Sequence, residues 1–279
     1  MNCYKVPPLS EEEEKLPVAR FYRDYPLYRP SPLQQQIIDQ GPMNPEKAIR
    51  PTDWLSLLEA DQTPEIVFGW CMLEDGSGYY IEYSVTPETI KPGMRRWYGT
   101  FYNRHSKNMP EGQGNLRYKI WNPMDHWDHR FVNGKDDSDG VWSLESLDIG
   151  KSGGGKNGVA AISHNINLRE YGLTEEKEAE LTKAGCRASA CWEEFEGQPG
   201  HHLVLRFSRP SVYGSMENLN CEWMGYWAKD GRIIRDEETE VDETYIKNVL
   251  IHNCVERQHL FEVLPDLYEE YHDKPLDAD

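Results

Sequence analysis

The sequence feature that most constrains the fold is an amphipathic helical pattern late in the chain, from Asp242 to about Tyr271. Side chains spaced by three and four residues along this segment fall on one face of an α-helix. That face consists of Tyr245, Val249, His252, Glu256, Leu260, Val263 and Leu267. Because all of these except the histidine and the glutamate are apolar or aromatic, we expect the face to be buried in the core of the fold.

Strand patterns occupy most of the chain before this helix. EIVFGWCML and GYYIEYSV flank the turn sequence EDGS and predict a hairpin. Further strands are predicted at 116–121, 141–149, 158–168, 186–194, 201–208 and 219–228. Shorter helices are predicted at 32–39, 53–59 and 174–184, and another from Thr86–Pro87 to about Asn103. Consecutive strands followed by one long helix predict an α+β fold, an antiparallel sheet folded around the C-terminal helix.

The N-terminal region differs in composition from the rest. Residues 1–62 are rich in proline and include an acidic run at 11–14. Prolines break long elements, and a run of like charges stays in solvent. We therefore predict an N-terminal arm or small subdomain at 1–62 and the main domain at 63–279.

Composition narrows the classes of partner. The chain of 279 residues has a formal net charge of −18, and it is rich in aromatic residues, with 9 Trp and 16 Tyr. Such an acidic surface repels phosphate backbones and anionic lipid, so we expect neither nucleic acid nor membrane as a partner. The sequence contains no secretory signal, no long apolar run and no CxxC pair among its six cysteines. These features predict a cytoplasmic protein with reduced thiols.

The helix carries a candidate pair of metal ligands. His252 and Glu256 are four residues apart on the apolar face, and side chains at this spacing point in the same direction. Burying a carboxylate costs several kcal/mol unless a positive group pairs with it. A metal ion is one such partner. The other interpretation is a His–Glu hydrogen bond in a partly hydrated interior, and the spacing alone leaves both open.

Two further candidates come from the strand patterns. Side chains alternate along a strand, which places Glu145 on the face shared by Val141, Ser143, Leu147 and Ile149. His126 follows the predicted strand at 116–121, at the edge of whatever cavity the sheet encloses. Two histidines and two glutamates form a ligand set that suits zinc, although its chemistry also allows iron or manganese.

At this point the sequence resembles a known family, the zinc-dependent phloretin hydrolases and diacetylphloroglucinol hydrolases. The resemblance covers residues 78–271 and rests on YSVTPETIKPGMRRWYGTFYNRH, LRYKIWNPMDH, ESLDIG and LIHNCVERQHLFEVLPDLYEEY. It implies a helix-grip (START-like) fold, a homodimer, and a Zn²⁺ ion held by His126, Glu145, His252 and Glu256. The segment between His126 and Glu145 is shorter than in the family.

The resemblance also implies residues that act on the substrate. Tyr118 matches a tyrosine that contacts a phenol or carbonyl oxygen, and strand alternation points it inward, where a structural core tyrosine is the alternative. His129 lies where some relatives carry an amide side chain, and a surface loop residue is the alternative. His201 and His202 both match a histidine on a late strand that helps to move protons. The apolar residues Leu203, Leu205 and Phe207 favour His201 as the inward residue, whereas the spacing to Arg206 favours His202.

The function that follows from the resemblance is hydrolysis of the carbon–carbon bond between an acyl group and a phloroglucinol-type ring. The substrate is then a small aromatic acylphenol, either phloretin or an acetylphloroglucinol, and the sequence does not distinguish them. Two alternatives stay open. One is a non-catalytic helix-grip carrier of aromatic ligands. The other is a metal hydrolase of the same fold that acts on another aromatic ketone or a β-diketone.

Overall fold

The computed structural model describes residues 6–26, 29–105, 109–147, 156–212 and 215–275. Within these ranges, no helix has the length and apolar character needed to cross a bilayer. The five cysteines in the described part of the chain are buried thiols, and Cys3 lies outside it.

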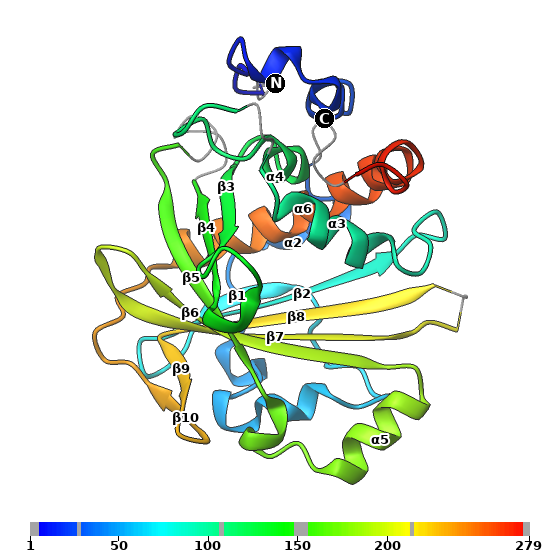
Figure 1. Cartoon of the computed structure of the whole chain (residues 1–279). Helices are drawn as coiled ribbons and strands as arrows, with labels where there is room; N and C mark the ends of the chain where they lie inside the picture. Colours follow the sequence, from blue (N-terminus) through cyan, green and yellow to red (C-terminus); the bar gives the residue numbers. More distant parts are fainter. Residues whose placement is uncertain (1–5, 27–28, 106–108, 148–155, 213–214, 276–279) are drawn as a thin grey trace. The chain divides into compact units, whose positions relative to one another are not determined.

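Helices and strands are labelled as in Figure 1. The helices are η1 (Glu13–Lys15), η2 (Pro17–Ala19), α1 (Arg20–Arg23), α2 (Pro32–Gln40), η3 (Pro45–Lys47), η4 (Pro51–Leu57), α3 (Met94–Tyr102), α4 (Leu116–Trp121), η5 (Asp137–Asp139), η6 (Leu168–Tyr171), α5 (Glu175–Lys183) and α6 (Glu243–Tyr271), where η denotes a 3-10 helix. The strands are β1 (Gly69–Met72), β2 (Gly78–Thr86), β3 (His126–Phe131), β4 (Val141–Glu145), β5 (Val159–Ile166), β6 (Arg187–Phe195), β7 (Gln198–Pro210), β8 (Met216–Met224), β9 (Tyr226–Lys229) and β10 (Arg232–Arg235).

The strands form one large sheet and one small one. Hydrogen bonds join eight strands in the order β1-β2-β8-β7-β6-β5-β4-β3, while β9 and β10 form a separate pair. The pairs β1–β2, β2–β8, β8–β7, β7–β6, β4–β3 and β9–β10 are antiparallel. A large antiparallel sheet together with the long helix α6 confirms the predicted α+β class and is consistent with a helix-grip fold.

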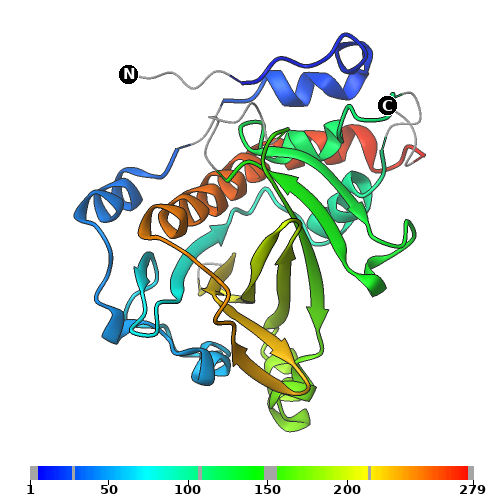
Figure 2. The ribbon, with the colours of Figure 1, turned by 90° about the vertical axis from the view of Figure 1, so that its left-hand side faces the viewer.

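The chain divides into two compact units. The first contains residues 1–29, 88–161 and 252–279. Its core is built from helices: Val18 and Phe21 near the N-terminus pack in one cluster with Val263 and Leu267 of α6. Figure 2 shows these blue N-terminal helices beside the red end of α6. A buried ion pair between Lys119 and Glu13, 2.7 Å from Nζ to Oε1, also ties the N-terminal segment to this unit.

The second unit contains residues 30–87 and 162–251. One face of its strands is apolar, and η4 and α5 cover it, with Trp54 of η4 and Leu181 of α5 in the same buried cluster as Leu205 and Phe207. Figure 1 shows α5 on this side of β7 and β8. Because side chains alternate along a strand, the neighbouring positions on β6, β7 and β8 face the other way, and these are largely polar.

Two predicted elements are wrong in type or position. Residues 116–121 form helix α4 and not a strand, because the buried Asn115 side chain accepts hydrogen bonds from the backbone N–H groups of Arg117 and Tyr118 and so caps a helix. The helix predicted to start at Thr86–Pro87 begins at Met94, after Gly93 with a φ of 92°. Thr86 instead ends strand β2, where its hydroxyl accepts a hydrogen bond from Asn218.

The other predicted elements are present, with shifts at their ends; the strand predicted at 141–149 ends at Glu145 as β4, and residues 148 and 149 lie outside the described residues. The predicted helix at 53–59 is the 3-10 helix η4, and the strand at 219–228 is divided between β8 and β9. The long C-terminal helix starts one residue after the predicted position. Along its predicted face, Val249, His252, Glu256, Leu260, Val263 and Leu267 are all buried. The domain boundary after residue 62 stays a prediction.

Candidate metal centre

All four predicted ligands lie in the first compact unit, and each belongs to a strand or a helix. His126 is the first residue of β3, directly after a tight turn in which its backbone N–H donates to the Asn122 carbonyl at 2.9 Å. Glu145 is the last residue of β4 and lies opposite His126 in the β3–β4 register. His252 and Glu256 follow one another by one turn of α6.

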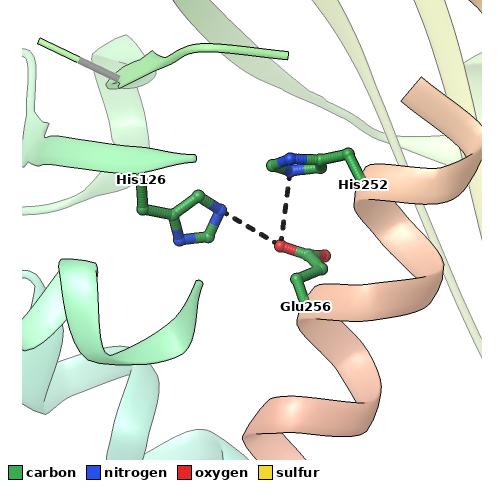
Figure 3. A group of neighbouring side chains, drawn as sticks. All are labelled: His126, His252 and Glu256. Carbon is green, nitrogen blue, oxygen red and sulfur yellow. Dashed lines mark ion pairs between the residues drawn. The ribbon is translucent and has the colours of Figure 1, made fainter. Parts of the chain in front are cut away.

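The side chains of His126, His252 and Glu256 converge on a common point (Figure 3). Oε2 of Glu256 lies 3.2 Å from Nε2 of His126 and 3.6 Å from Nε2 of His252. All three residues are buried, with at most 8 % of any of them exposed. A tetrahedral zinc site with bonds of about 2.0–2.2 Å requires ligand atoms about 3.3–3.6 Å apart. The observed separations lie close to that requirement.

Glu145 lies at the edge of this group. Its Oε2 is 3.4 Å from Nε2 of His252, again close to a tetrahedral edge, and its Oε1 accepts a hydrogen bond from the Tyr118 hydroxyl. The Glu145 side chain is 20 % exposed, more than those of the other three residues. Gly158 packs directly against the Glu145 carbonyl, so closely that a Cβ at this position would lie 1.9 Å from the carbonyl oxygen.

Asp125 holds His252 from behind, a role that sequence reasoning missed. Its Oδ2 lies 2.9 Å from Nδ1 of His252, and its Oδ1 accepts a hydrogen bond from Ser146. Asp125 is itself almost fully buried. A carboxylate at this nitrogen places the imidazole proton on Nδ1 and leaves the Nε2 lone pair free for a metal. The sequence did contain a signal for this role, because Asp125 directly precedes the predicted ligand His126 in NPMDH.

The electrostatics of the group are those of a cation site. Burial lowers the pKa of His252, but the hydrogen bond to Asp125 and the charges of Glu256, Asp125 and Glu145 outweigh it and raise the pKa to about 10. Burial raises the pKa of Glu256, but His126 and His252 reverse this and leave the pKa below its ordinary value. The carboxylates therefore hold positive charge at this point, which a bound cation also supplies.

The donor set passes a further test for a metal. Among the described residues, Nε2 of His126 has no partner with hydrogen-bond geometry, although Glu256 lies within ion-pair distance. A buried nitrogen in this state requires an explanation, and a bound ion is one. Imidazole nitrogens and carboxylate oxygens are ordinary ligands of zinc. The residues present thus fit the ion that the sequence predicts.

Tyr118 and His129 pack beside the candidate ligands. The Tyr118 ring stacks on His126 with 4.0 Å between ring centroids, and burial followed by the charge of Glu145 raises its pKa well above 10. The His129 ring is buried between Tyr102 and Tyr118, with centroids 4.8 Å and 4.7 Å away. Burial, reinforced by the nearby His126, lowers the pKa of His129 to about 3, so it is neutral at physiological pH.

The two candidate histidines of β7 lie in the second unit and have different surroundings. His201 is half-buried and pairs with Asp236, with 2.7 Å between Nδ1 and Oδ2. His202 is only 4 % exposed and pairs with Glu222, with 2.6 Å between Nδ1 and Oε1. The face of Leu203, Leu205 and Phe207, which favoured His201, is the one covered by η4 and α5. His202 belongs to the polar face.

Comparison with known proteins gives one family. The family model described as "DAPG hydrolase PhiG domain" matches residues 50–269, most of the chain. No curated protein matches the sequence.

Proposed function

We infer the function from two findings: the chain belongs to the DAPG hydrolase PhiG domain family, and its buried His126, His252 and Glu256 form a group that could hold a metal ion. We propose that it is a zinc-dependent hydrolase that splits the carbon–carbon bond between an acyl group and a phloroglucinol-type ring. The products are a phloroglucinol and a carboxylic acid. The observation that carries the proposal is the buried group of two imidazoles and a carboxylate at separations suited to tetrahedral coordination.

The substrate class follows from what the leaving carbon must tolerate. An aryl anion is too unstable to leave, but the keto tautomer of a phloroglucinol ring places the acyl bond next to ring carbonyls. The electron pair of the broken bond then forms an enolate. Overall, water adds its OH to the acyl carbon and one proton to the ring carbon. A zinc ion held by these residues would lower the pKa of a bound water to about 7 and would polarise a carbonyl oxygen.

The residues of this chain have separate tasks in that reaction. We assign His126, His252, Glu256 and Glu145 to holding the ion. We assign the Tyr118 hydroxyl, which donates to Glu145, to contact with an oxygen of the substrate. His129 packs against Tyr118 and is neutral, so we assign it a supporting contact. Between the histidines of β7, we assign proton transfer to His202, because it is the more buried of the two and lies on the polar face of the sheet.

The same observation gives less support to the two rival functions. A non-catalytic carrier of aromatic ligands has no use for two carboxylates beside two buried histidines. A metal hydrolase acting on another aromatic ketone or a β-diketone would use the same centre, and only substrates can separate it from our proposal. From the sequence we also propose that the enzyme works in the cytoplasm as a homodimer, with no nucleic-acid or membrane partner.

The test is incubation of purified protein with diacetylphloroglucinol, phloretin and a β-diketone, with chromatographic detection of products. We expect about one zinc per chain and release of a phloroglucinol from one or both acylphenols. Removal of zinc with a chelator should abolish release, and added zinc should restore it. Full activity in verified metal-free protein would contradict the metal assignment, and cleavage of the β-diketone alone would contradict the substrate class.

A further inference from the structure

The N-terminal segment, residues 6–26, belongs to the same compact unit as the candidate metal centre, although it precedes the residues matched by the family model, which begin at residue 50. Its Val18 and Phe21 pack in one buried cluster with Ile120 of α4 and Leu264 of α6. Apolar packing is non-directional, so it explains why the segment binds to these helices. The polar contacts of the segment are directional and show what it holds.

Residues 118–125 supply the groups that lie behind both candidate histidine ligands. The Tyr118 carbonyl lies 3.3 Å from Nδ1 of His126. Nδ1 of His252 lies 2.9 Å from Oδ2 of Asp125 and 3.3 Å from Nδ2 of Asn122. The backbone N–H groups of Asp125 and His126 both donate to the Asn122 carbonyl, at 3.1 Å and 2.9 Å, and close the turn that leads into β3. The position of this stretch therefore sets the orientation of both imidazoles.

Two buried polar contacts join this stretch to the N-terminal segment, one near each end. The first is the ion pair between Glu13 and Lys119, the residue that follows Tyr118, with side chains only 2 % and 4 % exposed. The Lys119 ammonium also lies 3.5 Å from the ring centroid of Trp127, directly after the candidate ligand on β3. A buried ammonium is costly without a partner, so this pair favours one register of the segment on α4.

The second contact acts on the turn itself. The Tyr22 side chain is buried, and its hydroxyl lies 3.2 Å from the Pro123 carbonyl and 2.9 Å from the Pro7 carbonyl. Burial raises the pKa of Tyr22, so the hydroxyl keeps its proton at physiological pH. Pro123 lies within the turn that the Asn122 carbonyl closes. Because a buried carbonyl that loses its donor is costly, the Tyr22 hydroxyl restrains the turn.

We propose that the N-terminal segment is a clamp on the candidate metal centre, with Tyr22 as the positioning residue that holds the turn before β3. The inference rests on the proposed function, because it requires that His126 and His252 bind an ion. Without the clamp, the turn samples arrangements in which the two imidazoles do not converge. The affinity for zinc then falls in proportion to the fraction of molecules in the competent arrangement. Residues outside the matched family domain thus contribute to metal binding.

The affinity test compares Tyr22→Phe with Tyr25→Phe in the full-length protein. Each variant loses one hydroxyl from the same segment, but the Tyr25 hydroxyl bonds to Asp266 of α6 and not to the turn. Zinc affinity, measured by competition with a chromophoric chelator, should fall by about threefold to tenfold in Tyr22→Phe and stay unchanged in Tyr25→Phe. Unchanged affinity in Tyr22→Phe overturns the proposal. An equal fall in both variants also overturns it, because the effect would then be a general loosening of the segment.

Hydrogen exchange of the metal-free protein tests the clamp without zinc or turnover. The backbone amides of Asp125 and His126, which close the turn, should exchange about threefold to tenfold faster in Tyr22→Phe than in wild type and in Tyr25→Phe. Amides that join β6 to β7 in the second unit are the internal reference and should not change. Equal rates at the turn overturn the proposal. If the wild type binds no zinc, the proposed function fails, and these exchange rates alone decide whether the segment holds the turn.

Discussion

The two histidine–glutamate groups of this protein use the same residue types with different geometry. In the first, Nε2 of His126 and of His252 approach the Glu256 carboxylate at 3.2 Å and 3.6 Å, while their Nδ1 atoms face oxygen acceptors on the opposite side. In the second, Nδ1 of His202 is itself bonded to Glu222 at 2.6 Å. Composition alone therefore does not distinguish side chains spaced for a metal ion from a hydrogen-bonded histidine–carboxylate pair. The distance between the ring nitrogen and the carboxylate oxygen does.

The largest expected effect separates the two groups directly. His252→Ala should lose zinc and lower kcat/KM by at least about a thousandfold, because a ligand and the ion it holds are removed together. His202→Gln should also impair turnover but retain zinc at the wild-type level. His272→Ala, which alters an exposed histidine just past α6, is the matched control and should keep both. Zinc loss in His202→Gln would erase the distinction between the groups.

A smaller effect is expected at Tyr118, which contacts a proposed metal ligand but is not a ligand itself. Tyr118→Phe removes the hydroxyl that bonds to Glu145 and keeps the ring stacked on His126. Zinc content should stay near the wild-type value while kcat/KM falls by roughly tenfold to a thousandfold, the scale of one lost hydrogen bond in an active site. Wild-type kinetics would identify Tyr118 as a core residue. Zinc loss would place it among the groups that hold the ion.

Asp125→Asn tests how His252 is oriented, with a still smaller effect. The variant keeps the size of the side chain but removes the charge that holds the Nδ1 proton of His252. Zinc affinity, measured by competition with a chromophoric chelator, should fall by about tenfold to a hundredfold. The control is Asp128→Asn, whose carboxylate lies on the same strand as His126 and pairs with His105. Equal zinc affinity in both variants would show that Asp125 does not tune the centre.

The smallest effect concerns a buried histidine that belongs to neither group. Burial lowers the pKa of His259 to about 4, despite its bond to the Pro26 carbonyl. The unfolded chain, with a pKa of about 6.5 at this residue, binds more protons between these values. The contribution of His259 to the free energy of unfolding is therefore present above pH 6.5. It is lost as pH falls toward 4, by up to about 1.4 kcal/mol per pH unit. Urea unfolding at several pH values should show that the free energy of unfolding depends less steeply on pH in His259→Gln than in wild type.

The parts of the molecule that could be predicted from the sequence are those set by local periodicity. The face of α6, including His252 and Glu256, follows from a spacing of three and four residues, and it is buried as predicted. Residues 116–121 have strand-like composition but form α4, because the side chain of Asn115 caps the backbone there. Capping hydrogen bonds of this kind leave no periodic signal.

The remaining features depend on contacts between distant segments. Asp125 contacts His252 across more than a hundred residues of sequence. The second group requires the register of three strands, since Glu193 and Glu222 meet His202 only through the pairing of β6, β7 and β8. The polar face of the sheet is the one that η4 and α5 do not cover. A sequence pattern on β7 alone therefore left His201 and His202 unresolved.

The position of the ligands along the chain has a consequence for biosynthesis. More than a hundred residues separate Glu145 from His252, and the last two ligands lie on the final helix, α6. During translation, the nascent chain has only the hairpin pair, His126 and Glu145, until α6 leaves the ribosome. Closing so long a loop costs conformational entropy that the bond to the ion must offset. If the proposed zinc site is correct, its four ligands can act together only once α6 has been synthesised, so we expect the ion to bind late in folding.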